Sequence, residues 1–158
     1  MNRMDVGQRH EQAVADRLRS EGWDVHVWGQ ALLSEPLRKA LLEQPHTVFW
    51  RWLPDMVAVR SDAIRLIDAK NEQRVDTPNY AIETAALTAH RAMERLGLGV
   101  TYVWPDFTVN WPAGLDIIKE FGAQRGQNGG SGTPFCLVRK ADQFPWELAF
   151  PSARSAAA

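Results

Sequence analysis

LPDMVAVRSDAIRLIDAK, residues 53–70, consists of two mainly apolar runs separated by the polar pair Ser61-Asp62, with charged residues toward the outer ends. Val, Ile, Leu and Ala dominate both runs, and a polar pair between two such runs is typical of a tight turn. The sequence therefore predicts a β-hairpin, with one strand over 48–60 and the other over 63–70.

The charged residues at the open end of this hairpin fall on one face. With the turn centred on the polar pair, Val57 faces Leu66 and Asp55 faces Asp68, with Cβ atoms about 4.5–5.5 Å apart. Lys70 lies two residues beyond Asp68, so the alternation of side chains returns it to the same face. Because charged side chains are rarely placed on a buried sheet face without a partner or a task, this cluster needs a chemical explanation.

Two carboxylates and a lysine at this spacing are suited to metal-assisted hydrolysis. The carboxylates of Asp55 and Asp68 repel one another unless a positive charge lies between them. Mg²⁺, with Mn²⁺ as a substitute, takes hard oxygen ligands and keeps water or phosphate oxygens at its other positions. Such an ion helps to activate water and offsets charge on a phosphodiester, while Lys70 orients or deprotonates the water or stabilises the developing charge. The cluster therefore predicts hydrolysis of phosphodiesters.

A fourth candidate residue comes from the first predicted helix, residues 7–21, which ends at Gly22. Val14 and Leu18 form its apolar stripe. Glu11 precedes them by three and seven residues and so lies on the same stripe. A carboxylate on the inward face of a helix has a purpose if it joins the metal site through a water. The alternative is that Glu11 lies at the edge of the stripe and reaches solvent.

The remaining sequence predicts further helices and strands: a strand at 23–28, a short helix at 34–44, a helix from Thr77-Pro78 to Gly97, a strand at 100–104, a short helix at 112–121 and a last strand at 135–140. This order indicates an α/β fold in which helices flank a central mixed sheet. We expect one domain over 1–150 and a flexible tail over 151–158.

Three segments of the chain resemble the motif of the PD-(D/E)xK nuclease superfamily: Glu11, Pro54-Asp55 and Asp68-Ala69-Lys70. The core of that superfamily, the restriction-endonuclease-like α-β-β-β-α-β order, is similar to the order predicted here over roughly residues 7–104. The likeness is greatest to small single-domain members, such as archaeal Holliday-junction resolvases and phage-type nucleases. Two departures are the helix inserted at 34–43 and Asp rather than Glu at position 68.

The resemblance implies a role for each matching position. Asp55 and Asp68 would be metal ligands, Lys70 the catalytic lysine, and Glu11 the helix-borne acid that contributes to the metal site. It implies a Mg²⁺-dependent endonuclease acting on nucleic acid, more on DNA than on RNA. Because junction cutters need paired active sites, it also implies a homodimer.

The bulk composition narrows the class of protein. A single cysteine, Cys136, excludes an internal disulfide and is consistent with a reducing compartment. No stretch has the apolar length of a membrane span and the N-terminus lacks the apolar region of a signal peptide, so we expect a cytoplasmic protein without membrane contact. The net charge of −1 argues against binding of nucleic acid by charge alone.

Other interpretations remain open at this point. The carboxylates and Lys70 would form a structural ion pair if the protein belonged to a toxin system or had a structural role, and a nuclease-like fold without catalysis would bind nucleic acid or a protein partner. Four tryptophans are candidates for stacking on unpaired bases, with core packing as the alternative for most of them: Trp28, Trp50, Trp52 and Trp104. The four histidines show no zinc-binding spacing.

Overall fold

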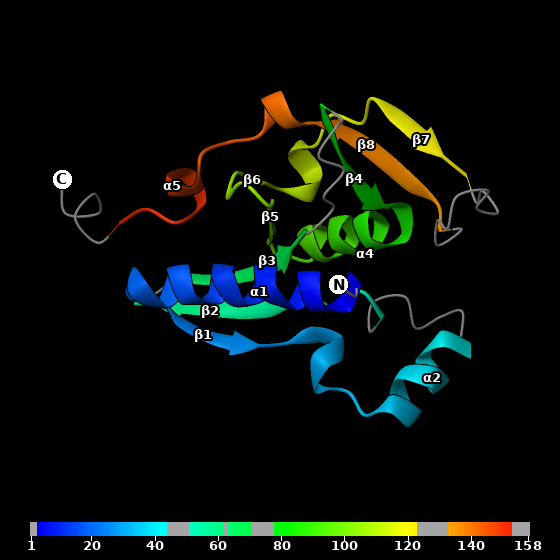
Figure 1. Cartoon of the computed structure of the whole chain (residues 1–158), viewed down its shortest axis with the longest axis horizontal. Helices are drawn as coiled ribbons and strands as arrows, with labels where there is room; N and C mark the ends of the chain where they lie inside the picture. The colour runs from blue at the N-terminus through cyan, green and yellow to red at the C-terminus, as the bar shows by residue number, and fades with distance from the viewer. Residues whose placement is uncertain (1–2, 44–50, 62, 71–77, 123–132, 153–158) are drawn as a thin grey trace.

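The computed structural model describes residues 3–43, 51–61, 63–70, 78–122 and 133–152. Its elements, in chain order, are α1 (Arg3–Ser20), β1 (Asp24–Val27), the 3₁₀ turn η1 (Gly29–Leu32), α2 (Glu35–Glu43), β2 (Met56–Arg60), β3 (Ala63–Ala69), β4 (Asn79–Glu83), α4 (Thr84–Arg95), β5 (Val100–Val103), β6 (Val109–Asn110), η3 (Pro112–Gly114), β7 (Lys119–Phe121), β8 (Phe135–Arg139), η4 (Lys140–Asp142) and α5 (Trp146–Ala149). Figure 1 shows their arrangement.

The central sheet has five strands in the order β1-β2-β3-β5-β6. Only the β3–β5 pair is parallel, so the sheet is mixed, as the sequence predicts. The predicted hairpin register is confirmed, because Val57 pairs with Leu66 and Val59 with Ile64. Ser61 has a φ of 54°, a left-handed conformation that suits the tight turn of a hairpin.

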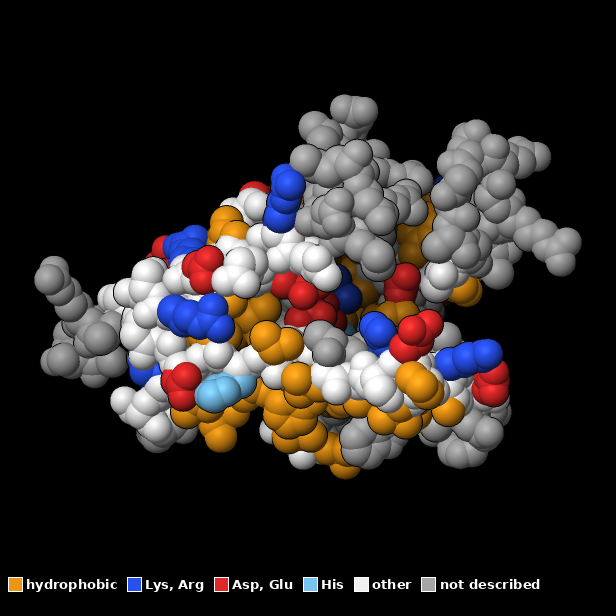
Figure 2. Space-filling view, turned by 60° about the horizontal axis from the view of Figure 1, so that its bottom comes forward, with side chains coloured by type: hydrophobic (Ala, Val, Ile, Leu, Met, Phe, Trp, Pro, Cys, Tyr) orange, Lys and Arg blue, Asp and Glu red, His pale blue; other side chains and the backbone are white. Residues whose placement is uncertain are grey.

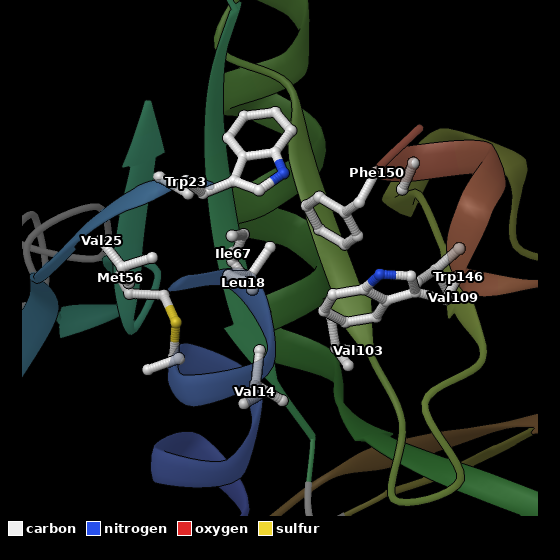
Figure 3. Close-up of a cluster of buried hydrophobic side chains, with 14 residues drawn as sticks. Val14, Leu18, Trp23, Val25, Met56, Ile67, Val103, Val109, Trp146 and Phe150 are labelled. Atoms are coloured by element: carbon white, nitrogen blue, oxygen red, sulfur yellow. The ribbon is translucent and has the colours of Figure 1, made fainter. Parts of the chain in front are cut away.

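Helices cover both faces of this sheet. On one face α1 packs against the hairpin, and Figure 3 shows Val14 and Leu18 of α1 in one apolar cluster with Ile67, Val103 and Trp146. On the other face α4 contacts β5 and the second sheet, whose strand order is β4-β8-β7 (Figure 1). The hairpin strands therefore lie in the middle of the α/β fold.

Both long helices end at the glycines that the sequence indicates. Gly22 has a φ of 86° and Gly97 a φ of 81°, the left-handed conformation that only glycine adopts without strain. After α1, Trp23 N–H donates to the Leu18 carbonyl at 3.0 Å, and after α4 the Leu98 N–H donates to the Met93 carbonyl at 3.0 Å. These are Schellman caps, and each directs the chain from its helix into the next strand.

The strand predicted over 48–60 is shorter than expected. It begins at Met56, and the segment from Arg51 to Asp55 is not part of a strand; residues 48–50 lie outside the described part. The physical reason is that pairing with β1 begins at the Val27↔Met56 rung. Ahead of that rung one more backbone hydrogen bond forms, from the Trp28 N–H to the Asp55 carbonyl, and the paired ladder does not extend to residues 51–54.

The helix predicted from Thr77-Pro78 begins later, at Thr84. Residues Asn79–Glu83 form β4, in which Tyr80 and Ile82 are buried and pair with β8. Pairing with a distant strand has overridden the helical spacing of Ile82 with the residues that follow it. The helix predicted at 112–121 is likewise reduced to η3, and its last residues join the second sheet as β7.

The strand predicted at 23–28 and the helix predicted at 34–44 are present as β1 and α2, and the strands predicted at 100–104 and 135–140 as β5 and β8. Within β1, Val25 is buried, whereas Val27 is 55% exposed. Near the C-terminus, α5 was not predicted. Among the described helices, none combines the length and apolar character that crossing a bilayer requires.

The C-terminal segment contributes to the core that supports α1. Phe150 is 1% exposed and Phe144 is 41% exposed, so these two phenylalanines form a matched pair. We expect Phe150→Ala to lower the free energy of unfolding by about 3–5 kcal/mol and Phe144→Ala by less than about 1 kcal/mol. Urea denaturation followed by tryptophan fluorescence measures both. Equal losses would contradict the docking of this segment.

Candidate active site

The predicted acidic residues and the lysine meet at the open end of the hairpin. Asp55 lies just before β2, Asp68 near the end of β3, and Lys70 directly after it. The Lys70 Nζ is 2.9 Å from Asp68 Oδ1, with the two side chains 16% and 11% exposed. The Lys70 N–H also donates to the Val103 carbonyl at 2.8 Å, which continues the pairing of β3 with β5.

Asp55 is tied to both neighbouring strands. The Ala69 N–H donates to Asp55 Oδ2 at 2.8 Å, and the Trp28 N–H donates to the Asp55 carbonyl at 2.7 Å. Burial raises the pKa of the Asp55 carboxyl well above its ordinary value, and the carboxylates of Asp68 and Glu11 raise it further. Asp55 is therefore fixed in place next to negative charge.

Glu11 lies half-buried on α1. Its carboxyl is close enough to the hairpin to interact electrostatically with Asp68. Burial raises its pKa, and the Asp68 carboxylate adds to the effect. Glu83, immediately before α4, is in a similar position. Burial raises its pKa, Lys70 and Arg51 oppose the rise, and Asp68 reinforces it. In the sequence Glu83 stands near the start of a predicted helix, where the helix dipole alone accounts for a carboxylate.

Lys70 is the lysine of this acidic cluster. Burial by itself lowers the pKa of its ammonium group, but the attraction of Asp68, Asp55 and Glu83 outweighs burial and leaves the pKa raised. The Nζ also lies 5.1 Å from the centre of the Tyr102 ring, a cation–π distance. Lys70 is thus held as a cation.

His90 is the residue of this region that sequence reasoning missed. It is fully buried on α4, and its Nε2 lies 3.4 Å from Asp68 Oδ2. The signal available in the sequence was its position three residues from both Leu87 and Met93, on the inward stripe of α4. A polar residue on such a stripe indicates a buried partner, although the sequence does not say which.

Figure 2 shows acidic side chains gathered in the middle of one face, beside a recessed basic group and bordered by hydrophobic side chains. An apolar pocket of about 420 Å³ is lined by Trp28, Leu53, Pro54, Leu66, Met93, Leu96 and Leu98. One of its lining residues, Pro54, directly precedes Asp55 in the chain. Of the tryptophans considered for base stacking, Trp104 is fully buried and Trp28 is 42% exposed, whereas Trp50 lies outside the described residues.

The donor atoms of this cluster suit a hard divalent cation. Carboxylate oxygens are the ligands that Mg²⁺ prefers. Burial raises the pKa values of Asp55 and Glu11, and neighbouring carboxylates raise them further. Within the described residues, no group of three His, Cys, Asp or Glu side chains is already close enough to hold a metal ion. Metal binding would therefore draw these carboxylates together.

Comparison with solved structures finds this fold in Hjc, a Holliday junction resolvase from the archaeal hyperthermophile Archaeoglobus fulgidus, with a TM-score of 0.52 and 14% sequence identity over 90% of this chain and 99% of that chain. D212, a nuclease from a fusselovirus, aligns with a TM-score of 0.44 and 12% identity over 90% of this chain and 84% of that chain. No protein family model and no curated protein matches the sequence. The expected likeness to this nuclease class is confirmed at the level of the fold.

The electrostatics of Asp55 lead to a prediction about stability in EDTA. Its pKa is raised in the folded state, so its ionisation disfavours folding. This penalty is absent below the ordinary pKa of aspartate, grows as the pH rises toward the folded-state pKa, and is complete above it. Asp55→Asn removes the charge but keeps an oxygen for the Ala69 N–H. It should raise the melting temperature at neutral pH, by about 2–4 °C for each kcal/mol relieved.

Differential scanning calorimetry between about pH 4 and about pH 8 tests this prediction. The advantage of Asp55→Asn over the wild type should grow with pH. Asp116→Asn is the matched control, since the Asp116 side chain is 73% exposed. A lower melting temperature for Asp55→Asn throughout this range would show that the Asp55 charge is satisfied in the folded protein.

Proposed function

We propose that this protein is a metal-dependent nuclease that hydrolyses phosphodiester bonds at Asp55, Asp68 and Lys70. The observation that carries the proposal is the hydrogen bond from the Ala69 N–H to Asp55 Oδ2 at 2.8 Å, which holds Asp55 beside the end of β3 that carries Asp68 and Lys70. The ion pair of Lys70 with Asp68 and the fold shared with a Holliday junction resolvase support it.

Asp55 and Asp68 would hold a Mg²⁺ ion, or Mn²⁺ in its place, and Glu11 would join the ion through a water. When bound, the ion supplies positive charge that acidifies a water and offsets charge on the phosphate. Glu11 faces this site from α1 with a raised pKa, which makes it a better proton acceptor than an ordinary glutamate.

Lys70 would orient the attacking water and stabilise the phosphate. Since its pKa is raised, it carries a proton at neutral pH and is suited to donating hydrogen bonds rather than to removing a proton. As the water oxygen bonds to phosphorus and the bond to the leaving oxygen breaks, negative charge builds on the phosphate oxygens. An ammonium group beside them stabilises this charge most in the transition state.

DNA is the proposed substrate in preference to RNA, because Hjc, a solved structure with this fold, is a Holliday junction resolvase. A junction cutter needs two active sites, so we also propose a homodimer. Trp28, Leu96 and Leu98, which line the apolar pocket, are 42%, 72% and 51% exposed, and subunit contacts commonly cover surface of this kind.

The alternative is a catalytically inactive nuclease-fold module that binds nucleic acid or a protein partner. The observation that favours it is the absence, among the described residues, of three metal-binding side chains already in contact distance of one ion. Binding that persists in EDTA, with no products in any metal, would support this alternative.

Loss of cleavage in site variants tests the proposed function. Labelled single strand, duplex, flap, four-way junction and RNA are incubated with Mg²⁺, Mn²⁺ or EDTA. We expect metal-dependent cutting that Asp68→Ala and Lys70→Ala each reduce by about a hundredfold or more. Lys39→Ala, at an exposed position on α2, is the control for loss of a positive charge. Substantial activity in both site variants, verified as folded by circular dichroism, would end the proposal.

Metal binding can also be measured without substrate. A cation that binds only the folded protein stabilises it, by about 2.7 kcal/mol at a hundred times its dissociation constant. We therefore expect Mg²⁺ to raise the melting temperature of the wild type and to have little effect on Asp55→Asn. A melting temperature that ignores Mg²⁺ and Mn²⁺ in the wild type would favour a structural role for the ion pair.

A further inference from the structure

His90 has a partner for each ring nitrogen, although its side chain is completely buried. Nε2 lies 2.8 Å from the Trp52 carbonyl oxygen and 3.4 Å from Asp68 Oδ2. Nδ1 lies 2.8 Å from the Tyr102 hydroxyl oxygen. Because a carbonyl oxygen can only accept a hydrogen bond, Nε2 carries a proton and donates it to the Trp52 carbonyl, and Asp68 Oδ2 lies near the same nitrogen at 3.4 Å.

The Tyr102 hydroxyl completes this assignment. In a neutral imidazole protonated at Nε2, Nδ1 accepts, so the hydroxyl donates. Burial lowers the pKa of His90, with the charge of Lys70 acting in the same direction against that of Asp68. Burial also raises the pKa of the Tyr102 phenol. A neutral ring that accepts from a protonated phenol agrees with both directions.

The two oxygens closest to His90 Nε2 belong to the two halves of the site. Trp52 lies three residues before Asp55 in the chain, in the segment that leads into β2 without being part of it. Asp68 lies on β3. On the other side of Asp68, Oδ1 contacts the Lys70 ammonium at 2.9 Å. Each oxygen of Asp68 therefore has a nitrogen neighbour, and the nitrogen near Oδ2 is the one that donates to the segment carrying Asp55.

We propose that His90 is a positioning residue, whose Nε2–H orients the Asp68 carboxylate and anchors the segment before Asp55, and so sets the placement of the two carboxylates relative to each other. This inference rests on the proposed function, since that placement matters for activity only if the carboxylates hold a divalent cation. His90 itself would touch neither the ion nor the substrate.

Two replacements of His90 separate the donor from the volume of the ring. His90→Gln keeps an N–H donor near the position of Nε2, whereas His90→Leu keeps apolar bulk and removes the donor. Mn²⁺ affinity is measured by titration calorimetry without nucleic acid. We expect His90→Leu to weaken Mn²⁺ binding about tenfold or more, the usual effect of removing a group that orients a ligand. His90→Gln should restore most of the affinity, and kcat should follow the same order.

His10→Leu is the matched control, because His10 is also a buried histidine whose Nε2 contacts a backbone carbonyl, that of Val103, at 3.2 Å. It should lower the melting temperature and leave Mn²⁺ affinity within about threefold of the wild type. Equal loss of Mn²⁺ affinity in His10→Leu and His90→Leu would reduce the role of His90 to general stability. Unchanged affinity in His90→Leu, with binding by the wild type, would overturn the proposal directly.

Two readouts do not depend on metal or activity, so they separate this inference from the proposed function. Long-range ¹H–¹⁵N NMR of the wild type in EDTA should show the tautomer protonated at Nε2. Melting temperatures of His90→Leu, Asp68→Asn and the double variant should be non-additive, since the two side chains act on each other. An Nδ1-protonated ring, or additive losses, would overturn the positioning role even in an active nuclease. A wild type that neither binds Mn²⁺ nor cuts would overturn the proposed function.

Discussion

The hydrogen bond from the Ala69 N–H to Asp55 Oδ2, at 2.8 Å, is the contact on which the candidate site depends. It joins the segment before β2 to the end of β3, just past the last paired rung, Met56↔Ile67. Because side chains alternate along a strand, a slip of one residue would turn Asp68 toward the face covered by α1. The geometry of the site is thus a consequence of backbone pairing, and the apolar clusters on both faces of the sheet hold that pairing in register.

This arrangement places several carboxylates close together in a partly buried region, where negative charge destabilises the folded protein. Asp55, Glu11 and Glu83 all have raised pKa values, with burial as the first cause and Asp68 as a contributor to each. Lys70 offsets part of this repulsion, and the pKa of His90 is lowered by burial, so His90 adds little positive charge at neutral pH. Natural proteins accept such local destabilisation mainly at functional sites, where a bound ligand relieves it. The cluster therefore fits a cation-binding centre better than a structural ion pair, which one acid and one lysine would satisfy.

The features predictable from the sequence were those that local patterns determine. The alternation around Ser61 fixes which residues pair across the hairpin, and the spacing of Val14 and Leu18 fixes the inward stripe of α1. The second sheet could not be predicted in this way. Ile82 continues the helical spacing of α4, yet it pairs with Cys136, 54 residues away. A contact at that separation cannot be detected in a short stretch of sequence, so tertiary pairing overrode the helical pattern of this segment.

The role of His90 could not be predicted from the sequence for a related reason. Trp52 lies ahead of the first rung of β2, where its carbonyl oxygen has no strand partner, and a buried carbonyl without a donor is costly. A histidine on the inward stripe of α4 supplies that donor. Any side chain with a donor that reaches the Trp52 carbonyl oxygen could make this hydrogen bond. A donor that also approaches Asp68 Oδ2, while Lys70 contacts Oδ1, does more than satisfy the backbone, since it makes the packing of α4 a determinant of how the acidic cluster is arranged.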